Sequence, residues 1–134
     1  MSAPSLQRIL YVEDDPDIRT IANLALSVVG GLTVEVCRSG AEALARAEAF
    51  RPDLLVLDVM MPDMDGPETL ARLRLLPQTE TTAAVFMTAK VQPSEVAHYM
   101  SLGALGVISK PFDPMQLAQQ LRAMWADAQA KVDP

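Results

Sequence analysis

The sequence predicts an α/β fold in which a parallel sheet carries helices on both faces, because two kinds of segment alternate along the chain. Short apolar runs rich in Val, Ile and Leu have the length and composition of buried strands. Stretches with apolar residues at helical spacing lie between them. Five such runs occur, at Ile9–Val12, Leu32–Val36, Leu54–Leu57, Ala83–Met87 and Gly106–Ile108. Five strands that alternate with five helices predict a doubly wound sheet.

Four of the helices are predicted from stripes of apolar residues that end at Gly or Pro, the usual stop signals. The stripes are Ile18, Ile21, Ala22, Ala25 and Val28/Val29, stopped by Gly30-Gly31; Ala41, Leu44, Ala45 and Ala47, closed by Arg51-Pro52; Leu70, Leu73 and Leu76, ended by Pro77; and a short one from Pro93 to about Leu102, stopped at Gly103.

The fifth helix has the clearest start. Asp113 is a good N-cap, and Pro114 stands where the first helical residue is expected. The apolar residues that follow at spacings of four, three and four are Leu117, Leu121, Met124 and Ala128. Trp125 does not share this stripe, so we expect it at the edge of the helix and partly exposed.

Length and composition describe one domain, spanning residues 1–134 with a core of about 7–128. With 11 basic and 17 acidic residues the net charge is -6, which disfavours direct nucleic-acid binding. The single cysteine, Cys37, excludes an internal disulfide and fits a reducing compartment, as a small buried side chain. No signal peptide or membrane span is visible, so the expected location is cytoplasmic.

Chemically reactive residues stand where the predicted strands end. In an open parallel sheet the carboxyl ends of the strands share one rim, where ligands bind. The residues that reach this rim are Glu13-Asp14-Asp15 after the first strand, Asp58 at the end of the third, Thr88-Ala89 after the fourth and Ser109-Lys110 after the fifth. Acids, a hydroxyl and an ammonium are therefore expected to converge.

Such a group of residues favours phosphoryl chemistry with a divalent metal. Crowded carboxylates repel one another, and Mg²⁺ relieves that repulsion with a few carboxylate oxygens, waters and substrate phosphate as ligands. Asp58 can then act as a carboxylate nucleophile toward phosphorus. The Lys110 ammonium would neutralise charge on the phosphoryl oxygens, and the Thr88 hydroxyl could donate to the attached group.

Each of these residues also has an ordinary structural explanation. Asp14 and Asp15 precede Pro16 and could simply cap the first helix. A lysine before proline is usually a solvated surface charge, and a threonine at a strand end usually reflects β-propensity. The functional interpretation therefore depends on all of them occurring together, at successive strand ends.

Four segments together resemble the receiver domains of two-component response regulators, of the chemotaxis-regulator type. They are Ile9–Pro16, Asp53–Gly66, Phe86–Ala89 and Lys110–Phe112, and the resemblance covers roughly residues 7 to 128. It implies a flavodoxin-like sheet of order 2-1-3-4-5. It also implies a phosphoprotein that accepts a phosphoryl group from a histidine kinase or a histidine phosphotransfer protein.

The resemblance assigns a role to each matching residue. Asp58 would be the phospho-acceptor and a Mg²⁺ ligand, with Asp14 binding the metal directly and Glu13 mainly through water. The backbone carbonyl of Met60 would supply a further oxygen. Thr88 and Lys110 would contact the phosphoryl group, and the small Ala89 would leave access to Asp58.

One position that couples phosphorylation to partner binding in the family departs from the family pattern. Many members carry Tyr or Phe three residues before the lysine, where this chain has Val107. A protein partner is expected on the fourth helix, fifth strand and fifth helix, with the domain a monomer or a weak dimer.

Two other functions remain open. One is an aspartyl-phosphate phosphohydrolase, disfavoured because Met60 stands where a second acid is expected; the other is a docking domain that needs no phosphorylation, disfavoured by the intact site residues.

Overall fold

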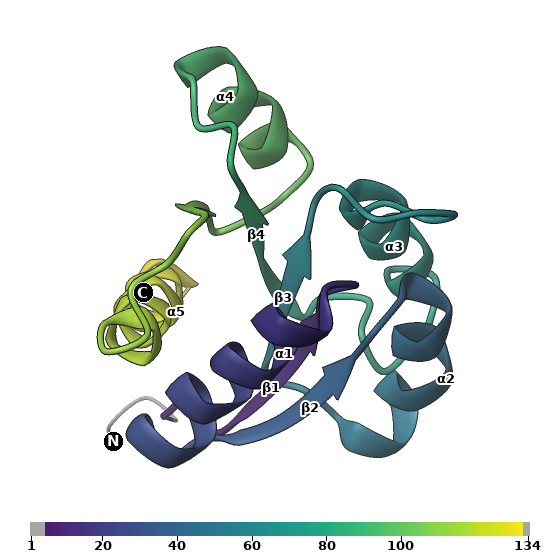
Figure 1. Cartoon of the computed structure of the whole chain (residues 1–134). Coiled ribbons are helices and arrows are strands. Elements are labelled where there is room, and N and C mark those ends of the chain that lie inside the picture. The colour runs from purple at the N-terminus through teal and green to yellow at the C-terminus, as the bar shows by residue number, and fades with distance from the viewer. Residues whose placement is uncertain (1–4, 133–134) are drawn as a thin grey trace.

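The computed structural model describes residues 5–132, which form a five-stranded parallel sheet of order β2-β1-β3-β4-β5 (Figure 1). The strands are β1 (Arg8–Val12), β2 (Thr33–Cys37), β3 (Leu54–Asp58), β4 (Ala83–Thr88) and β5 (Gly106–Ser109). The predicted fold class and strand order are confirmed. The second strand starts one residue later than predicted, because Leu32 turns into the core before the ladder begins.

Helices cover both faces of the sheet (Figure 1). They are α1 (Pro16–Asn23) with its π-helical continuation η1 (Leu24–Val29), α2 (Gly40–Phe50), α3 (Gly66–Leu73), α4 (Pro93–Ser101) and α5 (Leu117–Val132). Residues of α1, η1 and α5 share one apolar core with the sheet, and residues of α2 and α3 share the other. Alternate side chains of β1 feed the two cores, Ile9 and Tyr11 on one side and Leu10 and Val12 on the other.

The first helix departs from the predicted stripe. The α-helix gives way to π-helical geometry after Asn23, so that the Gly30 N–H bonds to the Ala25 carbonyl five residues back. This change of period turns Val28 and Val29 outward, with 73% and 50% of their surface exposed, whereas Leu26 is fully buried. The predicted contribution of Val28 and Val29 to the core was therefore wrong.

The stripe predicted for α2 is confirmed at Ala47 and at the partly buried Leu44, which packs against the core, but it is wrong at Ala41 and Ala45. Ala43 and Ala47 are buried, whereas Ala41 and Ala45 are exposed. Four alanines in seven residues carry little directional information, so packing against β1 and β2 decides which of them face the core. The Ser39 hydroxyl accepts a hydrogen bond from the Glu42 N–H at 3.1 Å and caps the helix.

At the C-terminal end, Asp113 accepts a hydrogen bond from the Met115 N–H at 2.9 Å, yet regular helix begins only at Leu117. The predicted start at Pro114 is therefore three residues early, because the first turn is irregular. Trp125 is buried, and its Nε1 donates to the Asp53 carbonyl at 3.3 Å. The expectation of a partly exposed tryptophan was wrong, and Trp125 is removed from the possible partner surface.

The short α4 follows β4, and none of its residues is buried. Its Tyr99 ring packs against Phe86 with ring centroids 5.3 Å apart. Cys37 is fully buried, as predicted. Across residues 5–132, none of the helices has the length and apolar character of a membrane span.

Candidate functional site

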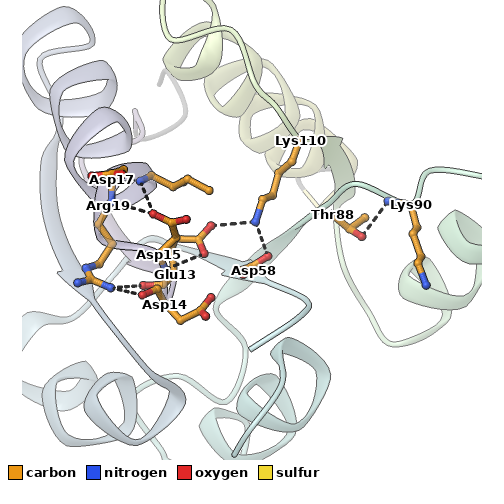
Figure 2. Close-up of polar contacts among 10 residues, drawn as sticks. Glu13, Asp14, Asp15, Asp17, Arg19, Asp58, Thr88, Lys90 and Lys110 are labelled. Atoms are coloured by element: carbon orange, nitrogen blue, oxygen red, sulfur yellow. Dashed lines mark hydrogen bonds and ion pairs between the residues drawn. The ribbon is translucent and has the colours of Figure 1, made fainter. Parts of the chain in front are cut away.

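The carboxyl ends of the strands bring the predicted residues to one rim of the sheet (Figure 2). Glu13 follows β1, Asp58 ends β3, Thr88 ends β4 and Lys110 follows β5. Asp58, Glu13 and Thr88 are all buried, with 3%, 1% and 3% of their surface exposed. Polar side chains this well buried at a sheet edge need either partners or a ligand.

Three carboxylates form the centre of this rim. One oxygen each from Glu13, Asp14 and Asp58 lies within 4.8 Å of the others. Mutual repulsion at such separations is relieved by a proton or by a cation. An all-oxygen set with one exposed member, Asp14, fits a hard divalent cation that keeps several waters, as Mg²⁺ does.

Lys110, which directly follows β5, bonds to two of these acids. Its Nζ donates to Glu13 Oε1 at 3.0 Å and to Asp58 Oδ1 at 2.9 Å (Figure 2). Burial alone would lower the pKa of Lys110, but its hydrogen bonds to Asp58 and Glu13 outweigh this and raise it. The lysine is therefore charged and is not the solvated surface group of the ordinary interpretation.

Glu13 carries a carboxyl with a perturbed pKa. Burial raises its pKa to about 7, and a hydrogen bond with Asp58 acts in the same direction. The bond from Lys110 opposes both. Glu13 therefore holds its proton close to neutral pH unless a cation replaces it.

The structure separates the two aspartates that follow Glu13. Asp15 Oδ1 accepts from the N–H groups of Asp17 at 2.8 Å and Ile18 at 3.3 Å, and so caps α1. The Asp14 side chain takes no part in the cap and lies with the acid cluster. Of the two interpretations of this pair, capping applies to Asp15 alone.

Thr88 and the loop after it complete the rim. In this structure the Thr88 hydroxyl accepts a hydrogen bond from the Lys90 N–H at 3.1 Å (Figure 2). The small Ala89 is exposed, and the Met60 side chain points into solvent with 69% of its surface exposed. The metal-binding role expected of the Met60 carbonyl remains a prediction.

Three residues near the rim were missed by the sequence analysis. A Cβ on Gly66 would lie 2.5 Å from the Asp58 carbonyl oxygen, so glycine alone lets α3 begin this close to Asp58. Arg19 Nη1 donates to the carbonyls of Glu13 at 2.9 Å and Asp14 at 2.8 Å. Tyr11 has a buried hydroxyl without a partner among residues 5–132, and burial, with the nearby Glu13 and Asp58 charges, raises its pKa. The Gly after the acidic loop and the Arg one turn into the helix were the available signals.

This fold and rim are those of a response regulator receiver domain. The model of that family matches residues 9–122, and the chain belongs to the family.

Two relatives and one solved structure illustrate what the chain is similar to. The chain is 39% identical over 109 residues to an uncharacterized 14.6 kDa protein of Leptolyngbya boryana, covering 81% of this chain and 82% of that one. It is 33% identical over 127 residues to the phosphate regulon transcriptional regulatory protein PhoB of Rhizobium meliloti, covering 95% of this chain and 56% of PhoB. It thus spans about half the length of PhoB and of the mycobacterial regulators TrcR and MprA, which it also matches. The chemotaxis protein CheY4 of Vibrio cholerae superposes with a TM-score of 0.82 at 32% identity, covering 90% of this chain and 99% of that one.

Proposed function

We propose that the domain accepts a phosphoryl group on Asp58, in a Mg²⁺-dependent reaction, and thereby changes its affinity for a protein partner. The observation that carries this proposal is the position of Asp58. Its carboxylate is buried at the end of the fully buried β3, within 4.8 Å of two other acids and 2.9 Å from the Lys110 ammonium. Nucleophile, cation site and charge-neutralising lysine are thus already together.

In the proposed reaction, an Asp58 oxygen attacks the phosphorus of a phosphohistidine in the donor protein. The new O–P bond forms as the P–N bond breaks, and the electron pair leaves with the donor imidazole. Glu13, Asp14, Asp58 and the Met60 carbonyl would hold Mg²⁺, which supplies charge neutralisation for the phosphoryl oxygens. Two groups of the chain assist: the Lys110 ammonium turns from the acids to a phosphoryl oxygen, and the Thr88 hydroxyl donates to another.

The two alternative functions have weaker support. A phosphohydrolase of this type needs an acid to protonate the leaving group, and the residue two positions after Asp58 is Met60, an exposed thioether without an acidic proton. A docking domain without phosphorylation would not need Lys110 bonded to two buried acids. We therefore regard the domain as a signalling module rather than an enzyme.

Several properties follow within the proposal. The donor is a histidine kinase or a histidine phosphotransfer protein, and the downstream protein binds α4, β5 and α5, without Trp125. The net charge of -6 disfavours direct contact with nucleic acid. We expect a cytoplasmic monomer or weak dimer without membrane contact, in keeping with a single buried cysteine.

The test is incubation with acetyl phosphate and Mg²⁺, followed by intact-mass analysis. The native chain should gain one phosphoryl group, and chelation of the metal should prevent it. Asp58→Asn keeps the shape of the side chain but removes the nucleophile, so it should gain none. Asp63→Asn is the matched control, since this exposed acid of the same loop has a φ of 69° that asparagine tolerates. Uptake by Asp58→Asn at the native rate would refute the assignment.

A further inference from the structure

Arg19 reaches back from α1 to the loop that carries the acids. Its Nη1 uses two hydrogens at once, donating to the Glu13 carbonyl at 2.9 Å and to the Asp14 carbonyl at 2.8 Å (Figure 2). Both bonds are charge-assisted, and such bonds are about twice as strong as bonds between neutral groups. The side chain is half-buried and makes no ion pair among residues 5–132.

The two carbonyls have no other donor within the described part of the chain. The ladder at this end of β1 finishes with the Glu13 N–H, which bonds to the Cys37 carbonyl at 3.0 Å. The next backbone bond is that of the Arg19 N–H to the Asp15 carbonyl, also at 3.0 Å. Between them the Asp15 N–H bonds to Glu13 Oε2 at 3.2 Å, and the carbonyls of Glu13 and Asp14 are held by the Arg19 guanidinium.

This backbone decides where the Asp14 carboxylate lies. Within residues 5–132 no donor contacts that carboxylate, which is exposed and yet lies within 4.8 Å of oxygens of Glu13 and Asp58. Repulsion among the three acids favours turning Asp14 outward into water. A loop held at two consecutive carbonyls keeps the Cα–Cβ bond of Asp14 directed toward the other two acids, so the carboxylate stays within reach of a shared cation.

We propose that Arg19 is a positioning residue for the cation site: it keeps the loop of Glu13 and Asp14 in the conformation that binds a divalent metal. The inference rests on the proposed function, because it concerns the same metal. Arg19 and Lys110 have different roles in this proposal. Lys110 bonds to carboxylate oxygens, and a metal or a phosphoryl group can replace those bonds. Within the described residues Arg19 bonds to backbone oxygens, so the carboxylates stay available to the metal.

Three variants of the full chain test the inference by calorimetric titration with Mg²⁺ alone. Arg19→Met keeps much of the aliphatic stem and removes the donors, so the Kd for Mg²⁺ should rise about ten- to hundredfold, as for other residues that orient metal ligands. Arg19→Lys restores a charged donor and should recover part of the affinity. Arg46→Met is the control, because Arg46 pairs with Glu35 and Glu42 on the surface and its loss should leave the Kd unchanged.

Phosphorylation by acetyl phosphate as a function of Mg²⁺ concentration gives a second measurement. With Arg19→Met the half-saturating metal concentration should rise, while the rate at saturating metal stays near the native rate. If Arg19 had a purely structural role, Arg19→Met would lower the unfolding midpoint but would not change the Kd measured at temperatures well below that midpoint. That result would overturn the inference. If Arg19→Met does not fold, Arg19→Gln is judged by the same Kd criterion. Absence of Mg²⁺ binding in the native chain would instead refute the proposed function.

Discussion

The strand that ends in Asp58 and the helix that follows Thr88 flank the same rim but are packed very differently. Every residue of β3 is buried, and its neighbours β1 and β4 pair with it along its length. No residue of α4 is buried, and its Tyr99 ring packs against Phe86 of β4. Local opening is easiest where few apolar contacts must break. The proposed chemistry therefore lies on a rigid part of the fold, beside a helix whose local opening should cost little free energy.

Thr88 connects the two regions. It ends β4, and its hydroxyl accepts the Lys90 N–H of the loop that leads to α4. On β5, Val107 pairs with Phe86, the residue that also contacts Tyr99. Val107 has one dominant rotamer and no hydroxyl, so an inward shift of Thr88 should displace the loop and α4 rather than flip a side chain of β5.

The largest effect should come from crowding the rigid region. Gly66→Ala places a Cβ 2.5 Å from the Asp58 carbonyl oxygen and 3.0 Å from Val59 Cα, so the acceptor backbone must shift. A misplacement of about 1 Å can slow a reaction by about 100-fold, and we expect a loss of this order in the rate of phosphorylation by acetyl phosphate.

Gly30→Ala is the matched control for that variant. Its Cβ would be 2.6 Å from Ala118 Cβ and 2.7 Å from the Leu26 carbonyl oxygen, on the opposite side of the fold from Asp58. It should lower the unfolding midpoint but leave phosphorylation near the native rate. Equal losses of phosphorylation in both variants would show that crowding acts through stability alone.

The pH dependence of metal binding tests the same region. The pKa of Glu13 is about 7, above its ordinary value of 4.5, so the folded metal-free protein retains a proton that Mg²⁺ must displace. The affinity for Mg²⁺ should fall by up to about tenfold per pH unit below 7 and level off above it. Conversely, the stability that this carboxyl gives the metal-free fold is complete below pH 4.5 and is lost as the pH rises through about 7.

Glu13→Gln should flatten this pH profile, whereas Glu68→Gln, at an exposed position of α3, should not. Calorimetric titrations between pH 5.5 and 8.5, a range of about 1.5 units on each side of that pKa, provide the measurement. A native profile without slope near pH 7 would contradict the role given to the Glu13 proton.

Hydrogen exchange probes the mobile region. With the phosphoryl mimic beryllofluoride, protection should change across residues 90–102, by about 1 kcal/mol of local opening free energy, the lower end of typical coupling energies. If the change in protection were confined to the surroundings of Asp58, phosphorylation would not be coupled to partner binding through α4. In that case the helix should be abandoned as the switch.

The smallest expected effect concerns the lifetime of the phosphoryl group. The thioether of Met60 offers no good hydrogen bond to orient a hydrolytic water, and the ammonium of Lys90 cannot act as a base toward it, so dephosphorylation should be slow. Met60→Asn combined with Lys90→Glu should shorten the lifetime a few-fold, measured by the decay of the phosphorylated mass after removal of the donor. Met115→Asn serves as control, since Met115 is similarly exposed at 67% but lies outside the loops of the site.

The sequence was informative where several residues occur together at the ends of successive buried strands. Strand ends marked by Asp58, Thr88 and Lys110 were placed correctly, because buried apolar runs of this length leave little choice of position. The inward faces of the alanine-rich α2 and the π-helical η1 were predicted only in part, since their orientation depends on packing and on a change of helical period. Arg19 and Gly66 act through backbone atoms of other residues, and a sequence pattern does not show such contacts before the fold is known.

Lys110 is bonded to residues 97 and 52 positions away, so the site closes only after the first, third and last strands have assembled. Contacts of such sequence separation form late, because chain entropy opposes them until the intervening structure is in place. A partly assembled chain would therefore carry Asp58 without its lysine. Uptake of phosphoryl groups by a refolding sample should lag behind the recovery of helical circular dichroism, which makes phosphorylation a probe for completion of the sheet.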